Sequence, residues 1–206
     1  MTTRTITGLY DNYAEAAQTV REIEAIGVSR DDVSVVANNI DNQHVTEQDS
    51  NVGSDAAIGT GLGAALGGGA GLVAGLGLLA IPGVGPVVAA GWMAAVFVGA
   101  VTGAGAGGAT GGIIGLFTSS GVSKEHAHIY AEGIRRGGTL VTARADEDHA
   151  AAVEQIMLSN HAVDPTLRGR TYRDAGWKSF DATANPYTAT ELAEERQRNR
   201  DLTPVL

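Results

Sequence analysis

The sequence predicts an α+β fold in which two strand–helix–strand units flank a long insertion. At both ends of the 206-residue chain, short strand-forming runs alternate with segments whose apolar residues recur at helical spacing. Between them, from Ala56 to Ser123, there is no charged residue and no histidine, and this stretch holds 21 of the 29 glycines. The insertion therefore differs in chemistry from the domain that carries it.

The first block, residues 1–40, predicts a strand, a helix and a second strand. Residues 3–10 are rich in Thr and Ile, and Asp11 offers an N-cap oxygen to the helix that follows. Gly27 stands where a left-handed C-terminal cap is expected, and residues 33–37 (VSVVA) predict the second strand. The apolar positions of the helix fall at three- and four-residue steps: Tyr13, Ala16, Ala17, Val20 and Ile23.

A polar linker, residues 41–55, leads to the insertion, and a second unit, residues 121–167, follows the insertion. In this unit Ser123 can cap a helix that runs to Arg136, where a pair of glycines stops it. The predicted faces of this helix are Ala127, Tyr130, Ala131 and Ile134 on the apolar side, and Lys124, His128, Glu132 and Arg135 on the polar side.

The rest of the second unit repeats the plan of the first. Residues 139–144 predict a strand, Asp146 caps a further helix, and residues 161–167 supply a short last strand that Pro165 limits to a sheet edge. The two units are the halves of a ferredoxin-like βαβ·βαβ domain, with four antiparallel strands and both long helices on one face. The insertion falls between the second and third strands.

The uncharged block, residues 56–120, carries glycines at every fourth position in two series. This spacing places them on one face of a helix, where the missing Cβ atoms let another backbone approach closely. The predicted helix-packing residues are Gly59, Gly63, Gly67, Gly71, Gly75, Gly91, Gly99, Gly103, Gly107, Gly111 and Gly115. Between the series, a turn is predicted at Pro82, Gly83, Gly85 and Pro86. The block therefore predicts a glycine-zipper helical hairpin with arms at residues 56–80 and 87–118.

Three environments are open to this hairpin. Its arms are long enough to cross a hydrocarbon core of about 30 Å, so a membrane-embedded hairpin is the leading interpretation. A soluble hairpin buried against other copies is the second, since one chain of this length lacks the apolar surface to cover two uncharged helices. A flexible linker is the third, although linkers mix Gly with Ser and Pro rather than with Ala, Leu, Val and Ile.

No catalytic or cofactor-binding constellation is predicted. The absence of cysteine excludes disulfides and thiolate metal sites, and a net charge of −9 argues against nucleic acid as a partner. Gly103, Gly105 and Gly108 match G-x-G-x-x-G but follow no strand, so we expect no dinucleotide cofactor. A remote alternative is a metal-binding regulator built on His128 and Glu132, which lie four residues apart. We expect no enzyme, no resident metal and no small-molecule substrate.

Residues 168–206 predict a polar tail with one short helix. Thr188 and Glu191 have the spacing of a capping box at the start of that helix. Basic residues gather at its end: Arg196, Arg198 and Arg200. A solvated helix, or contact with anionic headgroups or a neighbouring subunit, would account for them.

Two segments of the flanking blocks, residues 5–37 and 121–146, share several specific positions with a known family. These are Gly8-Leu9-Tyr10-Asp11, Gly27 with Asp31-Asp32-Val33, and Tyr130-x-x-Gly133-x-x-x-Gly137-Gly138-x-Leu140-Val141. With them the chain resembles the bacterial general stress protein family with the heat-induced, YflT-like domain. The resemblance implies a small, stress-induced, non-enzymatic protein and supplies no catalytic residues. Compact members of that family lack the glycine-zipper insertion.

We therefore expect a non-catalytic general stress protein that associates with membrane lipid, self-assembles as a homo-oligomer, or does both through its hairpin. The folded domain would stay in the cytoplasm beside the inner membrane, because a hairpin returns both of its ends to one side while its uncharged turn crosses the bilayer. The alternative is a soluble ring, shell or filament in which the hairpins form a shared core.

Overall fold

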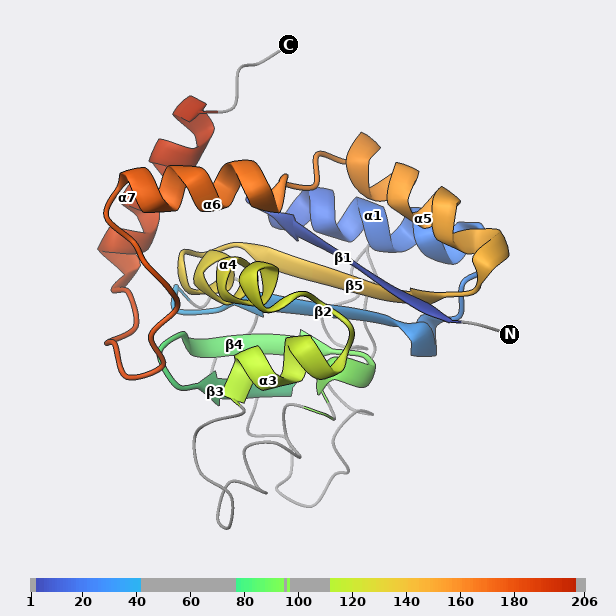
Figure 1. The fold of residues 1–206 in the computed structure, drawn as a ribbon, viewed down its shortest axis with the longest axis horizontal. Coiled ribbons are helices and arrows are strands. Elements are labelled where there is room, and N and C mark those ends of the chain that lie inside the picture. The colour runs from blue at the N-terminus through green and yellow to red at the C-terminus, as the bar shows by residue number, and fades with distance from the viewer. Residues whose placement is uncertain (1–2, 42–76, 95, 97–111, 203–206) are drawn as a thin grey trace.

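A computed structural model of the chain describes residues 3–41, 77–94, 96 and 112–202. The described parts form one sheet with helices on both faces (Figure 1). In chain order the elements are β1 (Arg4–Tyr10), α1 (Tyr13–Ala25), the 3-10 turn η1 (Arg30–Asp32), β2 (Val33–Asn38), β3 (Gly77–Ile81), β4 (Gly85–Ala90), α3 (Gly112–Ser119), α4 (Lys124–Arg135), β5 (Thr139–Ala145), α5 (Glu147–Ser159), α6 (Pro165–Asp174) and α7 (Ala189–Leu202).

The strands form a five-stranded antiparallel sheet in the order β1-β5-β2-β4-β3. β5 lies between the two strands of the first unit, so that Leu140 is opposite Leu9 of β1 and Val36 of β2. The prediction of an α+β fold is therefore confirmed, and its sheet is antiparallel. Two strands from the uncharged block, β3 and β4, join the sheet, and the predicted fourth strand does not form, so the sheet has five strands instead of the predicted four.

Alternate side chains of the sheet contribute to two apolar layers. The layer beneath α1 and α5 contains Ile6, Val20, Ile23, Val35, Val141 and Val153. The layer beneath α3 and α4, which cross the near side of the sheet in Figure 1, contains Leu9, Val36, Phe117, Tyr130, Ile134 and Leu140. The prediction that α1 and α5 cover the same face is confirmed. The covering of the other face by α3 and α4 is not foreseen by the sequence patterns.

The predicted helical arms are wrong at the centre of the uncharged block, where β3 and β4 form a β-hairpin. The physical reason is the second edge of β2. All six residues of β2 are buried, so the backbone groups on that edge need hydrogen-bond partners, and β4 supplies them. Uncharged residues such as Val87 and Val88 suit a strand well, and pairing with β2 decides their conformation.

The predicted turn between the two arms is confirmed as a turn between strands. Val84 N donates to Ile81 O at 3.0 Å, and Gly83 and Gly85 have φ of 76° and 97°. These left-handed conformations cost glycine nothing, which explains the glycines of the IPGVGP sequence. Pro82 and Pro86 flank these two glycines, and Pro86 lies in β4.

Two of the eleven predicted helix-packing glycines lie in the described part. Gly91 follows β4 with φ 78°, and a Cβ there would lie 2.1 Å from Val33 O, so it packs against a strand and not a helix. Gly115 is in α3, and no described atom lies within 4 Å of a Cβ built on it. The others lie outside the described residues, and for them helix packing stays a prediction: Gly59, Gly63, Gly67, Gly71, Gly75, Gly99, Gly103, Gly107 and Gly111.

Most predicted helix ends are confirmed. The side chains of Ser123 and Asp146 cap α4 and α5, and Gly27 and Gly137 have the left-handed conformation expected after a helix. The N-cap of α1, however, is Asn12, whose side chain accepts from Ala14 N at 2.8 Å. Asn12 takes this place because the predicted cap, Asp11, is bound to an arginine of α6.

The predicted last strand, residues 161–167, is wrong except for one bridge. Val163 N donates to Leu9 O at 2.8 Å, and the chain then turns into α6. Asp164 caps that helix and Pro165 occupies its first turn, where proline fits a helix because its nitrogen has no hydrogen to bond. The predicted polar tail therefore begins inside a helix.

Candidate functional site

The β3–β4 turn is not the free tip of a hairpin. Val84 is fully buried, and a Cβ on Gly83 would lie 2.6 Å from the backbone oxygen of Asp181. The turn therefore packs against the C-terminal part of the chain, and the prediction that it crosses a bilayer is wrong. Within the described residues, no helix combines the length and apolar character that a membrane span requires.

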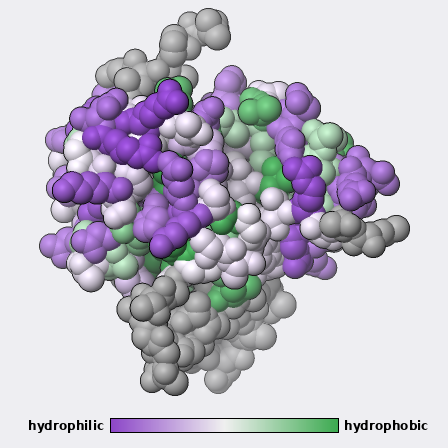
Figure 2. All heavy atoms as spheres, viewed as in Figure 1, coloured by the Kyte–Doolittle hydropathy of each residue, from purple (hydrophilic) through white to green (hydrophobic). Residues whose placement is uncertain are grey.

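Both uncharged flanks of the hairpin join it at one end. Gly77 is paired with Ala89, so the residues that precede β3 and those that follow β4 attach opposite the turn. Residues such as Leu79, Trp92 and Ile114 are only partly buried in the layer beneath α3 and α4. In Figure 2, hydrophobic atoms reach the surface in this region, whereas hydrophilic side chains gather over α6 and the C-terminal segment.

We define residues 177–202 as the C-terminal strap. From the end of α6 the strap runs along the hairpin turn and returns as α7 (Figure 1). Phe180, 7% exposed, enters the same apolar layer as Val84 and Met93. A Cβ on Gly85 would lie 2.9 Å from Pro186 Cβ, so the strap also lies against the start of β4.

The C-terminal end of α4 lies at the centre of the junction between the C-terminal strap and the rest of the domain. Arg136 Nε donates to Glu132 Oε1 at 2.7 Å, and its Nη1 donates to Glu195 Oε1 of the strap at 2.6 Å. Its guanidinium also stacks 4.3 Å from the centre of the Tyr172 ring. Burial would lower the pKa of Arg136, but the hydrogen bonds that it donates to Glu195 and Glu132 outweigh burial, and the pKa is raised. The arginine is therefore a permanently charged group between α4 and the C-terminal strap.

Glu132 is a buried part of this ionic cluster and not the solvated ligand that the sequence suggests. Its side chain is 1% exposed and lies within salt-bridge distance of Arg135 as well as Arg136. Burial, and to a smaller extent Lys124, lowers the pKa of His128. In the described part of the chain, no three metal-ligating side chains come together. Both carboxylate oxygens of Glu132 accept hydrogen bonds from arginines. The structure therefore does not arrange Glu132 and His128 as ligands of a common metal.

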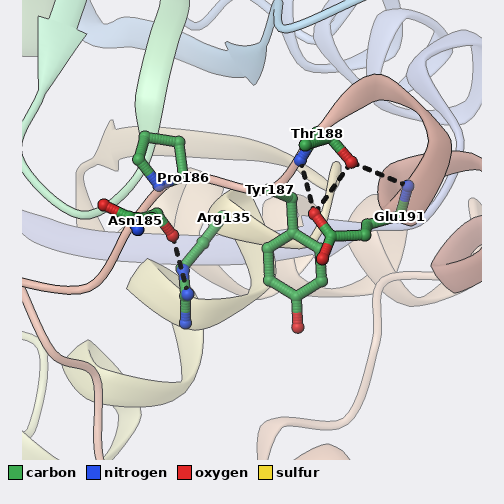
Figure 3. A pocket seen from close by; sticks show the side chains of 6 residues that line it. All are labelled: Arg135, Asn185, Pro186, Tyr187, Thr188 and Glu191. Atoms are coloured by element: carbon green, nitrogen blue, oxygen red, sulfur yellow. Dashed lines mark hydrogen bonds between the residues drawn. The ribbon is translucent and has the colours of Figure 1, made fainter.

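A shallow polar depression of about 470 Å³ opens where the strap crosses α4 (Figure 3). Its lining residues are Arg135, Asn185, Pro186, Tyr187, Thr188 and Glu191. Arg135 Nη2 donates to Asn185 O at 2.9 Å, and its guanidinium lies 4.9 Å from the centre of the Tyr187 ring. These contacts use the arginine to hold the strap.

The predicted capping box of α7 forms the rim of this depression. Thr188 N and Oγ1 each donate to Glu191 Oε2 at 2.8 Å, and Glu191 N donates back to Thr188 Oγ1 at 3.3 Å. This part of the tail is confirmed as predicted. The polar atoms of the cap bind one another, and this is a structural use of the carboxylate.

Further charged pairs connect α6 and the strap to the first block of the chain. Arg168 binds Asp11 through both carboxylate oxygens, at 2.8 and 2.5 Å, and Asn199 Nδ2 donates to the same carboxylate at 3.3 Å. Arg196 forms an ion pair with Asp41, at the end of the first block. Burial raises the pKa of Tyr172, which lies among these groups, to about 12.

Sequence reasoning did not assign the residues of this junction to a common site. Arg135 and Arg136 were visible as a basic pair before two glycines, and Arg196 as one of the tail arginines. Their partners cannot be predicted from neighbouring residues, because Glu195, for example, lies 59 residues from Arg136. Leu192, fully buried, is one of few apolar residues in a mostly polar helix, and these residues form no periodic pattern.

Comparison with known proteins adds no relative. No family model, no curated protein and no solved structure matches the chain.

Proposed function

We propose that this protein is a non-catalytic general stress protein that self-associates through its uncharged block, residues 56–120. The observation that carries the proposal is the anchoring of this block in the sheet. Its centre is bound to β2, and its uncharged flanks, with nine of the ladder glycines, attach at one end of the hairpin. Uncharged chain of this length needs a partner surface, and other copies of the same chain provide one.

Association with membrane lipid is the second candidate. The uncharged flanks before β3 and after β4 favour it, because they carry no charge that would oppose contact with a hydrocarbon core. On this alternative the folded domain lies in the cytoplasm beside the inner membrane. The hairpin turn takes no part, since it is buried against the strap.

The ferredoxin-like topology belongs to the same proposal. The order of β1, β5 and β2, with α1 and α5 on one face, supports it. In this interpretation the fourth strand is reduced to the bridge between Leu9 and Val163, and β4 and β3 extend the other edge of the sheet.

The stress-protein assignment rests on the family resemblance, and packing explains several of its motif residues. A Cβ on Gly133 would lie 2.4 Å from Leu9 Cδ2, and one on Gly138 would lie 2.9 Å from Gly133 O. Tyr130 donates its hydroxyl hydrogen to Thr7 O at 3.2 Å. These positions dock α4 onto β1, which supports a structural and non-catalytic use of the motif.

Light scattering on the purified chain, with and without mild detergent, tests the proposal. We expect a particle larger than one chain that persists without detergent and floats weakly or not at all with lipid vesicles. Flotation with vesicles together with a monomer in detergent would instead favour the membrane alternative. A chain that is monomeric without detergent and does not float with vesicles would contradict both self-association and membrane association.

A further inference from the structure

We propose that the C-terminal strap is a releasable clamp on the β3–β4 hairpin, and that its release frees the hairpin and promotes association between copies of the chain. The link to association rests on the proposed function. The clamp itself rests on the contacts of the strap alone.

The middle of the strap covers the turn of the hairpin. Phe180 packs into the apolar layer that contains Ile81 and Val84, and the backbone at Asp181 lies directly against Gly83. Because the approach at Gly83 involves backbone atoms of both segments, side-chain motion alone cannot open it. The turn cannot leave its position while the strap is in place.

The strap also binds the strand to which the hairpin is attached. Arg196 pairs with Asp41, three residues beyond the end of β2 at Asn38. Next to this ion pair, Asn39 N donates to Pro86 O at 2.9 Å and joins the end of β2 to the start of β4. One element, α7, therefore fixes the point where β2 and the hairpin meet.

One buried apolar side chain and two ion pairs attach α7 to the rest of the domain. Leu192 is the one buried apolar side chain among those described in α7, and it lies against Gly137, where a Cβ would be 3.1 Å from its side-chain atoms. Two ion pairs, Arg136 with Glu195 and Arg196 with Asp41, hold the helix on either side. Because these four side chains are only 6–22% exposed, loss of one partner leaves a largely buried charge unpaired and weakens the attachment of α7, whereas the apolar layer beneath α1 and α5 does not depend on these pairs.

Release of the strap would uncover apolar surface next to the uncharged block. Withdrawal of Phe180 opens the apolar layer that also contains Val84 and Met93, which are now almost fully buried. A newly exposed apolar patch on a molecule that already carries uncharged flanks favours contact with a second copy. The strap thus couples a charge-dependent contact to the surface that we propose for self-association.

Hydrogen exchange on the full chain tests the clamp. In the double variant Arg196→Gln/Glu195→Gln, we expect amides of β3 and β4 to exchange at least about tenfold faster, while amides of β1 and β5 keep their rates. The matched control is Arg4→Gln/Glu154→Gln. It removes an exposed ion pair of 2.9 Å between β1 and α5. This control should leave the exchange rates of both groups of amides unchanged. Light scattering on the same samples should show a larger particle only for the strap variant.

The possible results separate the clamp from the proposed function. Unchanged exchange in β3 and β4, or equal acceleration in every strand, would overturn the clamp. Faster exchange in the hairpin without a change in particle size would uphold the clamp and overturn its link to association.

Discussion

At the scale of single residues, glycine has two distinct uses in the described part of the chain. At Gly121 it supplies only a left-handed backbone, φ 91°, with nothing within 4 Å of a Cβ. At Gly91 the backbone is also left-handed, but a Cβ would meet Val33 O at 2.1 Å. Close approach to β2, and not helix packing, therefore explains the glycine at position 91.

These two positions give a matched test. We expect Gly121→Ala to lower the free energy of unfolding by about 1 kcal/mol, the cost of a strained backbone. Gly91→Ala should cost about 3 kcal/mol more, because the new methyl group collides with a backbone oxygen that cannot move without breaking the sheet. Urea denaturation of both variants measures the difference. Equal losses would show that Gly91 does not approach β2 as described.

Glu132 shows what the junction does to one carboxylate. Its removal leaves Arg136 partly buried with a single carboxylate partner, and Arg135 loses a charge partner. We expect Glu132→Ala to lower the free energy of unfolding by about 3–5 kcal/mol, the usual cost of breaking a buried ion pair. The control Glu194→Ala, at an exposed position of α7, should stay within about 0.5 kcal/mol of the unaltered chain. A small effect of Glu132→Ala would contradict its buried role.

At the scale of elements, the uncharged block is not uniform. Its centre forms strands because β2 offers an edge that must be paired, whereas α3 near its end is helical and packs on α4. The four-residue glycine spacing therefore cannot predict one conformation for the whole block. Helix packing through the ladder stays a prediction for residues outside the described part.

The ladder can be tested at Gly107. If its helices touch backbone to backbone, Gly107→Leu places a side chain in the contact and should reduce particle size or thermal stability. Helix propensity alone gives the opposite sign, a gain of about 1 kcal/mol or less in the free energy of unfolding. The control is Thr110→Leu, three residues along and off the ladder. Identical behaviour of the two variants in thermal melts and light scattering would mean that the glycine spacing has no packing role.

At the scale of the whole molecule, net charge opposes association. The chain carries −9 at pH 7, with a sequence pI near 4.9, so copies repel one another at neutral pH. We expect the particle measured by light scattering to grow as ionic strength rises from about 0.01 to 0.15 M, since the Debye length then falls from about 30 to 8 Å. Lowering the pH from 7 towards 5 should act in the same direction. A particle size that is independent of both would contradict self-association limited by charge.

The sequence by itself determined the features that depend on near neighbours. The caps at Ser123 and Asp146, the left-handed Gly27 and the box of Thr188 with Glu191 each need only a few adjacent residues, and all were predicted correctly. The helical spacing of α1 and α5 likewise fixed which faces they bury, and so the α+β class.

Only the tertiary structure decided the conformation of β3 and β4 and the burial of Glu132. An uncharged run has no polar face to reveal its periodicity, so the partner strand β2, far away in the sequence, sets its conformation. Glu132 looks solvated on its own helix, but in the fold it is buried and pairs with Arg136, which also pairs with Glu195 of the strap. Both outcomes depend on contacts between residues distant in the sequence, which local spacing does not encode.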